Sequence, residues 1–179
     1  SFNPVFGVTR NPYDRARTAG GSSGGAAAAL ACRMVAVADG SDMMGSLRTP
    51  AAFNNVYGLR TSFGLVPHGP TEEVFFQQFS VSGPMARNIP DLALLLSVQA
   101  GFDARLPLTR RHDDVALLGQ PLERDFKGTR IGWLGDLGGY LPIETGVFTT
   151  CEKALDHFRT VGCTVEKAVV DFDLAQLWK

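Results

Sequence analysis

The fold of this chain is decided by residues 18–59, which read TAGGSSGGAAAALACRMVAVADGSDMMGSLRTPAAFNNVYGL. The glycine- and serine-rich stretch 20–25 predicts a turn, because glycine adopts backbone conformations that other residues avoid. The alanines that follow have high helix propensity, so we expect a helix over 25–34. Ser23 stands where the N-cap of that helix would lie.

A strand and a second serine-bearing turn follow this helix in the sequence. Residues 35–38 are apolar and predict a short buried strand. The polar stretch 41–45 predicts a turn that leads to Ser46, and 47–54 predicts another short helix. A helix of about ten residues carries the chain out by ~15 Å, and a strand of about five residues brings it back by ~16 Å. We therefore expect the two serine-bearing turns to lie side by side at one edge of a sheet.

Two serines in neighbouring turns suit acyl transfer. Both turns precede predicted helices, whose free N-terminal N–H groups stabilise negative charge. One serine can attack a carbonyl carbon and the other can relay a proton, while backbone amides hold the oxyanion. A phosphate-binding turn would need a nearby lysine, and a dinucleotide-binding turn would need a preceding strand. The sequence has neither feature at 20–25, which disfavours both nucleotide interpretations.

The sequence resembles the amidase signature family in three motifs. They are GGSSGG at 20–25 with its alanine-rich helix, GSDMMGSLRTPAAF at 40–53 and VYGLRTSFGLVP at 56–67, with a weaker match at SGPMAR, 82–87. The resemblance implies an α/β fold in which a mixed central β-sheet is flanked by helices. It also implies a hydrolase with a Ser–cis-Ser–Lys triad and no metal or organic cofactor.

The resemblance assigns roles to residues of both turns. Ser46 takes the position of the nucleophile, and Ser22 takes the bridging position, where the preceding peptide bond is cis in such enzymes. The backbone amides of Met43, Met44 and Gly45, with that of Ser46, would form the oxyanion hole. The family usually has a small residue where Met44 stands, so we expect a differently shaped acyl pocket with an intact oxyanion hole.

Three further residues are expected to support the turns. Asp42 and Arg48 flank the nucleophile position, and we expect them to brace the turn by an ion pair or by backbone N–H bonds to Asp42. Ser23 is the third. The triad lysine of the family belongs upstream of these motifs, whereas all four lysines of this chain follow Ser46 and match no family position: Lys127, Lys153, Lys167 and Lys179.

The sequence is expected to form a single amidase-like domain over 1–179, incomplete at both ends and inactive by itself. Asn88 is predicted to cap a helix over 89–100, with a proline in its first turn and a glycine past its end. A βαβ unit is expected further on, with strands over 130–134 and 163–170 around a helix over 144–161.

Composition excludes several classes of partner. A net charge of −1 and a pI near 6.3 argue against nucleic acid or an anionic membrane. No apolar run reaches the ~20 residues of a membrane helix. Three cysteines without metal-like spacing predict reduced core thiols in a cytoplasmic protein: Cys32, Cys151 and Cys163.

Three other side-chain groups have an ordinary explanation. The aromatic residues at 75, 76 and 79 could line a substrate pocket, but we favour a place in the core. The charged run 110–114 is interpreted as a solvated surface and not as a metal or phosphate site. The histidines (68, 112 and 157) lie in a loop, the charged run and a helix, and no G-x-S-x-G turn surrounds Ser46, which disfavours a Ser–His–Asp hydrolase.

The sequence thus predicts an amidase that hydrolyses a carboxylic amide, as a small-molecule substrate, to a carboxylate and ammonia or an amine. One alternative is the glutaminase subunit of a transfer-RNA-dependent amidotransferase, with a partner subunit. Another is a non-catalytic module, if the triad lysine is missing from the natural protein. Direct nucleic-acid or membrane contact is not expected, and homo-oligomer formation is left open.

Overall fold

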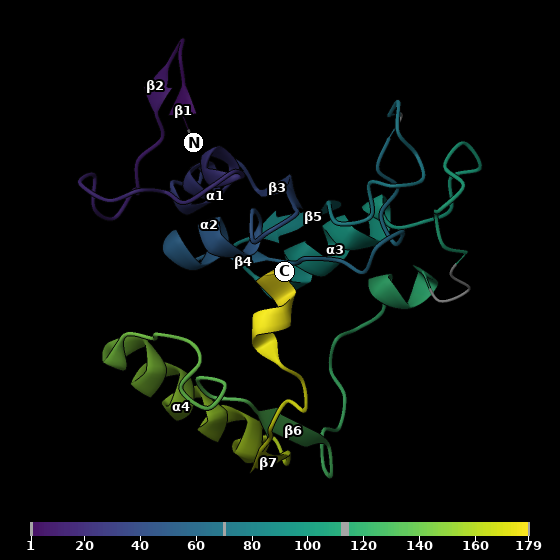
Figure 1. Ribbon diagram of the computed structural model, residues 1–179. Helices are drawn as coiled ribbons and strands as arrows, with labels where there is room; N and C mark the ends of the chain where they lie inside the picture. Colours follow the sequence, from purple (N-terminus) through teal and green to yellow (C-terminus); the bar gives the residue numbers. More distant parts are fainter. Residues whose placement is uncertain (1, 70, 112–114, 179) are drawn as a thin grey trace. The chain divides into compact units, whose positions relative to one another are not determined.

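A computed structural model gives the structure of residues 2–69, 71–111 and 115–178 (Figure 1). The chain divides into two compact units, residues 1–122 and 123–179, which we describe separately. Both contain helices and strands, so the predicted α/β class is confirmed. The described strands form separate small sheets. The main sheet of the first unit is antiparallel, and that of the second unit is parallel.

The first unit is built around a three-stranded antiparallel sheet in the order β3-β5-β4. Its strands are β3 (Val37–Asp42), β4 (Tyr57–Gly58) and the central β5 (Val81–Ala86). The other elements of this unit are β1 (Phe2–Asn3), β2 (Gly7–Val8), α1 (Gly24–Ala31), α2 (Arg48–Phe53), α3 (Ile89–Gln99) and the 3₁₀ helix η1 (Val115–Gly119).

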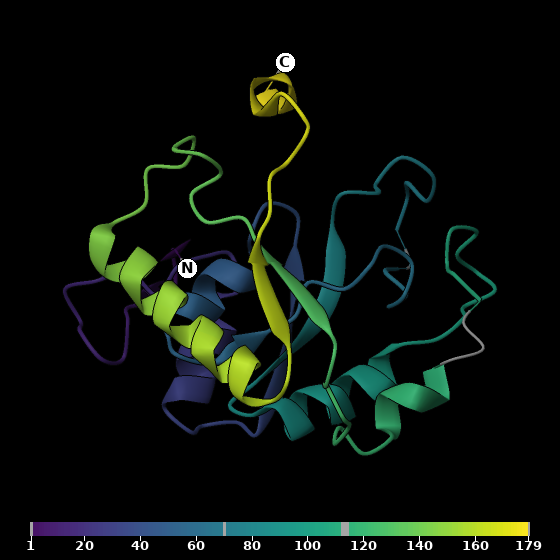
Figure 2. The same cartoon turned by 90° about the horizontal axis from the view of Figure 1, so that it is seen from below.

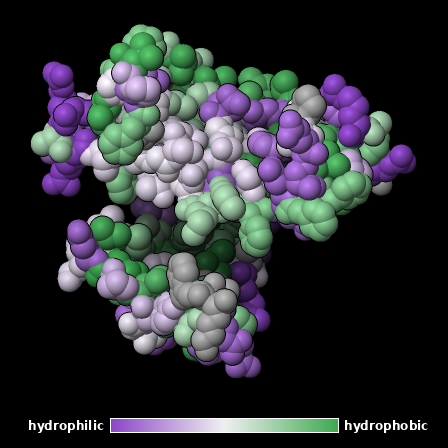
Figure 3. Space-filling view, turned by 45° about the horizontal axis from the view of Figure 1, so that its top comes forward, coloured by the Kyte–Doolittle hydropathy of each residue, from purple (hydrophilic) through white to green (hydrophobic). Residues whose placement is uncertain are grey.

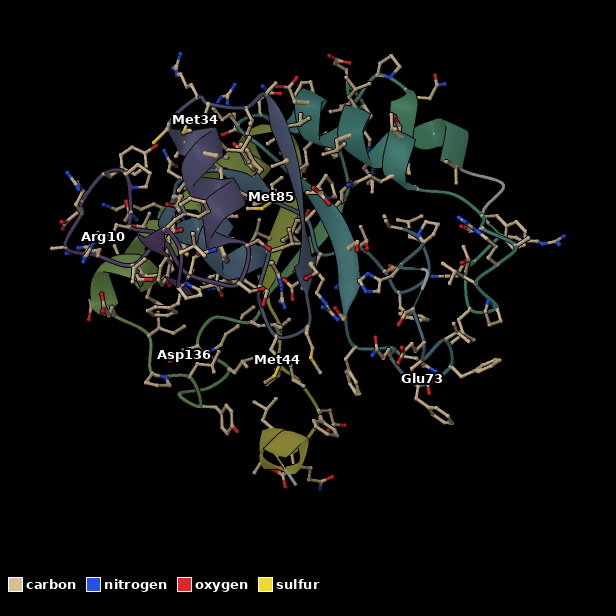
Figure 4. All side chains as sticks on the ribbon, turned by 90° about the horizontal axis from the view of Figure 1, so that it is seen from above. Arg10, Met34, Met44, Glu73, Met85 and Asp136 are labelled. Carbon is tan, nitrogen blue, oxygen red and sulfur yellow. The ribbon has the colours of Figure 1, made fainter. Side chains whose placement is uncertain are left out.

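Helices cover both faces of this sheet. Met85 of β5 is fully buried in a cluster with Ala27 and Leu30 of α1, Leu47, and Ala51 of α2. Successive side chains of a strand face opposite sides, and Pro84 is also fully buried, so the second face is covered too. Because α3 contacts β5, we infer that α3 covers it, and Figure 4 shows β3 and β5 between α1 and α3.

The strand over 35–38 was predicted too early and too short. β3 begins at Val37 and continues through Asp39 and Gly40 to Asp42, paired along its length with β5. Gly40 belongs inside the strand because a Cβ there would overlap with the Ser23 hydroxyl and lie 2.8 Å from a methyl group of Leu47. This glycine permits close packing and does not mark a turn.

The predicted helices are confirmed with shifted ends. α1 and α2 are shorter than expected, and Ser23 holds the N-cap position of α1 without a side-chain capping hydrogen bond. The Asn88 side chain does cap α3, since its Oδ1 accepts a hydrogen bond from the Asp91 N–H at 2.8 Å. No helix within the described residues is long and apolar enough to span a membrane.

The second unit confirms the predicted βαβ connection. β6 (Arg130–Trp133) and β7 (Thr164–Lys167) pair in parallel, and α4 (Thr145–Thr160) connects them. Figure 2 shows the two strands side by side with α4 along them. The unit ends in a 3₁₀ helix, η2 (Leu174–Trp178).

Two predictions about buried side chains are wrong. Phe75, Phe76 and Phe79 are 55%, 83% and 72% exposed, so they are not core residues. Cys32 and Cys151 are exposed free thiols, and only Cys163 is buried. Figure 3 shows that apolar residues are exposed on the surface among hydrophilic ones. The three phenylalanines lie in a loop, Cys32 is the C-cap residue of α1, and Cys151 lies on an exposed part of α4. Composition alone does not determine burial at such positions.

Candidate active site

The structure joins the two serine-bearing turns directly. The backbone N–H of Ser23 donates a hydrogen bond to the carbonyl oxygen of Ser46 at 3.1 Å. The peptide bond between Gly21 and Ser22 is cis, as the resemblance implied. Ser22 is exposed and Ser46 is half-buried. The predicted side-by-side arrangement of the turns is therefore confirmed.

Two asparagines hold the first turn against α2. The fully buried Asn54 donates from Nδ2 to the carbonyl oxygens of Ala19 at 2.7 Å and Pro50 at 2.8 Å. Asn11 donates from Nδ2 to the Phe53 carbonyl oxygen at 2.6 Å. These bonds fix the chain shortly before Ser22 relative to the helix that follows Ser46.

The second turn folds around the carboxylate of Asp42, which is fully buried. Its Oδ1 accepts the N–H of Gly45 at 2.8 Å, and its Oδ2 accepts those of Leu47 at 3.2 Å and Arg48 at 3.3 Å. Asp42 thus satisfies backbone donors of the turn and of the start of α2, as an aspartate at a helix N-terminus does.

Two arginines pair with the same carboxylate. Arg48 donates from Nε to Oδ2 at 2.9 Å and from Nη2 to Oδ1 at 3.0 Å. Arg60 donates from Nη1 to Oδ1 at 3.1 Å. The Arg48 guanidinium and, to a smaller extent, the backbone N–H groups hold the pKa of Asp42 well below its usual range, against the opposing effect of burial. The expected ion pair of Asp42 with Arg48 and the expected backbone N–H bonds to Asp42 are both present, and their bracing role remains a prediction. Asp42 is an anion at neutral pH.

Three backbone donors of the second turn are left for a ligand. The N–H groups of Met43, Met44 and Ser46 have no hydrogen-bond partner within the described part of the chain. Gly45 must be corrected, since its N–H is already bound to Asp42. Met44 is 80% exposed, and Figure 4 places it in the loop beyond the end of β3.

The remaining polar groups of the site are the hydroxyls of Ser22, Ser23 and Ser46. Ser23 Oγ donates to the carbonyl oxygen of Ser41 at 3.4 Å, which ties its turn to β3 and fits its expected supporting role. No hydrogen bond joins the hydroxyls of Ser22 and Ser46 in the described structure. Chemically, the site offers two hydroxyls on hydrogen-bonded turns, one of them followed by α2 and surrounded by free N–H groups.

Known proteins are similar to this chain along most of its length. The profile of the family described as Amidase matches residues 1–174. This chain belongs to the amidase family. It is similar to a subunit of glutamyl-tRNA(Gln) amidotransferase from Ralstonia nicotianae, with 39% identity over 176 residues that include 91% of this chain and 35% of that protein. The corresponding subunit from Saccharolobus solfataricus is 46% identical over 132 residues, which include 74% of this chain and 27% of that protein.

Solved structures support the same family. A bacterial aryl acylamidase of the amidase signature family superposes with a TM-score of 0.83 at 35% identity, over 97% of this chain and 35% of that one. The glutamyl-tRNA(Gln) amidotransferase subunit from Thermotoga maritima gives a TM-score of 0.78 at 29% identity, over 93% of this chain and 36% of that one. The chain spans about 35% of the length of the first of these curated relatives.

Sequence reasoning missed two parts of this candidate site. Arg60 lies within the motif at 56–67, but nothing in that motif connects it with Asp42, 18 positions earlier. Asn54 was expected only as the last residue of a helix, although a buried amide commonly marks a needed hydrogen bond. The contacts of Asn54 with Ala19 and of Arg60 with Asp42 depend on the tertiary fold. The only signal in the sequence for Arg60 was its place in the motif at 56–67, and Asn54 lies just past the end of the motif at 40–53.

Other polar groups of the chain lie outside this site. His68 Nδ1 lies 2.9 Å from Ser82 Oγ, beside a cavity of about 40 Å³ whose lining includes His68 and Glu73 but neither Ser22 nor Ser46. No group of three metal-ligating side chains occurs among the residues described. The central residues of the charged run 110–114, which are 112–114, lie outside those residues.

Proposed function

We propose that the protein containing this chain hydrolyses carboxylic amides through an acyl-enzyme on Ser46, with Ser22 as the bridging hydroxyl. The observation that carries this proposal is the hydrogen bond from the Ser23 N–H to the Ser46 carbonyl oxygen, which holds the two serine turns against each other. Membership of the amidase family supports the same chemistry.

The reaction begins with the Ser46 hydroxyl. Ser46 gives its proton to Ser22, and Ser22 passes its own proton to a lysine that the resemblance places outside residues 1–179. The Ser46 oxygen bonds to the amide carbon, and the carbonyl electron pair moves onto the oxygen. The N–H groups of Met43, Met44 and Ser46 then donate hydrogen bonds to this oxyanion. Backbone amides do not change charge during the reaction, so these donors need no particular protonation state.

The intermediate then collapses. The C–N bond breaks, the proton returns through Ser22 to the leaving nitrogen, and ammonia or an amine departs. Water attacks the acyl-enzyme, losing a proton to the same relay, and releases the carboxylate and Ser46. Each step uses hydroxyls, backbone amides and the relay lysine, so the proposal requires no cofactor.

The test is removal of each hydroxyl from the complete enzyme. Ser46→Ala and Ser22→Ala should lower amide turnover by at least about 10³-fold, because members of a catalytic triad act as a unit. Ser62→Ala is the matched control, since Ser62 is exposed and its hydroxyl makes no recorded hydrogen bond in the described structure. A fluorophosphonate probe should label the peptide that contains Ser46. Retained turnover in Ser46→Ala, or labelling elsewhere, would refute the assignment.

A second candidate is glutamine hydrolysis as one subunit of an amidotransferase. The similarity to glutamyl-tRNA(Gln) amidotransferase subunits favours it. It predicts that glutamine is hydrolysed in preference to an aryl amide such as 4-nitroacetanilide, and that the protein co-purifies with another subunit. Preference for the aryl amide by an isolated protein supports the general amidase instead.

We also propose that the protein is cytoplasmic and that its site binds a small molecule. Three free cysteines fit a reducing compartment such as the cytoplasm. The partner of the site itself is a small-molecule amide. Gel filtration of the complete protein distinguishes a monomer, a homo-oligomer and a complex with a second subunit.

A further inference from the structure

We propose that Arg60 is the positioning residue that sets the oxyanion hole, by holding the carbonyl groups of Asp42 and Met43 so that the next two N–H groups point toward the substrate. This inference rests on the proposed function, because it concerns how the same site binds the oxyanion.

The contacts of Arg60 are concentrated on the backbone of the second turn. Its Nη1 donates to the carbonyl oxygen of Asp42 and lies 3.5 Å from that of Met43, at the outer limit of a hydrogen bond. The same nitrogen contacts Asp42 Oδ1. From Nη2 the side chain donates to the Phe79 carbonyl oxygen at 2.8 Å. Nη2 of the guanidinium thus binds the segment before β5, and Nη1 binds the second turn.

These contacts fix the direction of two peptide groups. A trans peptide is planar, and its C=O and N–H point in opposite directions. Among the described residues only the Gly21–Ser22 peptide is cis, so the peptides after Asp42 and Met43 are trans. When Arg60 attracts both carbonyl oxygens to one side, the N–H groups of Met43 and Met44 must point to the other. Successive N–H groups that point the same way form an anion-binding concavity.

The two donors that Arg60 orients are among those left without a partner. The N–H groups of Met43 and Met44 bind nothing within the described residues, whereas that of Gly45 is taken by Asp42. Arg48 differs from Arg60 although both pair with Asp42. Arg48 contacts only the carboxylate and none of the turn carbonyls. The two arginines therefore form a matched pair: both neutralise Asp42, but only Arg60 holds the peptides.

The experiment compares arginine variants of the complete enzyme by their rate of reaction with a fluorophosphonate. The phosphoryl oxygen of this probe occupies the place of the substrate carbonyl oxygen, so its rate reports the oxyanion hole without knowledge of the natural amide. The final extent of labelling counts the correctly folded sites. Arg60→Met should react about 10- to 100-fold more slowly per site, somewhat less than the loss of a complete oxyanion donor.

Conservative and matched variants separate positioning from folding. Arg60→Lys should recover part of the rate, because an ammonium group can reach one carbonyl but cannot form the guanidinium fork. Arg48→Met should lose less rate than Arg60→Met, since it removes an Asp42 partner and no carbonyl contact. Arg105→Met, on an exposed ion pair with Asp103, should react as the wild type does.

The outcomes distinguish this inference from the function on which it rests. If the wild-type protein is not labelled at Ser46, the proposed function itself fails. If Ser46 is labelled and Arg60→Lys reacts at the wild-type rate, the positioning role is refuted, even if Arg60→Met does not fold. Equal rate losses in Arg48→Met and Arg60→Met would also refute it, because the effect would then come from the charge of Asp42.

Discussion

Asp42 carries the most consequential buried charge in the described residues. Its carboxylate accepts three backbone N–H groups and pairs with Arg48 and Arg60, while none of its surface is exposed. Burial of a carboxylate is costly unless such partners are present. Asp42 therefore links the stability of this region to the shape of the turn that carries Ser46.

We predict that Asp42→Asn lowers the free energy of unfolding by about 2–4 kcal/mol, because the amide cannot accept all of these donors and its own NH₂ group opposes one of them. Urea titration of the complete protein measures this. Asp14→Asn is the control: Asp14 pairs with Arg17 on the surface, so its loss should cost at most about 0.5 kcal/mol. Similar losses in both variants would contradict the bracing role.

The pH dependence of stability should show the same carboxylate. The folded-state pKa of Asp42 is lowered, chiefly by Arg48, so the unfolded chain takes up this proton first as the pH falls. The advantage of the wild type over Asp42→Asn should be complete above about pH 5 and should shrink below the ordinary pKa of about 3.9. Other lowered pKa values cancel in the comparison, including that of Asp103, which Arg105 lowers to about 2. A constant difference down to pH 2 would contradict this prediction.

At the scale of elements, the N-caps of α1 and α3 differ although both residues suit the position. Asn88 accepts the Asp91 N–H, whereas Ser23 turns its hydroxyl to Ser41 instead of to α1. We predict that Asn88→Ala costs about 1 kcal/mol of unfolding free energy and that Ser23→Ala costs less than about 0.5 kcal/mol, because only the first removes a cap. Thermal unfolding of both variants tests this, and a larger loss in Ser23→Ala would overturn the assignment.

The elements also show where local sequence is a sufficient guide. α3 was predicted closely because its cap, its early proline and its apolar spacing all lie within the helix. β3 was predicted poorly because its length depends on pairing with β5, some 40 residues away, and on the close approach of Ser23 and Leu47 to Gly40. Short strands are stabilised by their partners more than by their own residues.

At the scale of the whole molecule, the serine turns could be predicted from the sequence because motif and segment length both place them. The contacts around those serines could not be predicted from the sequence. Arg60 lies beside Asp42 only in the folded sheet. The Gly45 N–H donates to Asp42 because of a turn geometry that residue spacing does not predict. The expectation of a single domain over 1–179 remains a prediction beside the two compact units.

The last prediction concerns the proton relay across the whole protein. In the proposed mechanism Ser22 needs an acceptor for its proton. The resemblance places that lysine outside residues 1–179, and the lysines at 127, 153 and 167 match no family position. We therefore predict that residues 1–179 produced alone hydrolyse no amide above the level of Ser46→Ala, whereas the complete enzyme does. Hydrolysis of glutamine and 4-nitroacetanilide by equal concentrations of both proteins measures this, with circular dichroism as the control for folding. The prediction is wrong if residues 1–179 alone hydrolyse an amide and Ser46→Ala abolishes this activity. The proton acceptor would then lie within residues 1–179, because no other part of the protein is present.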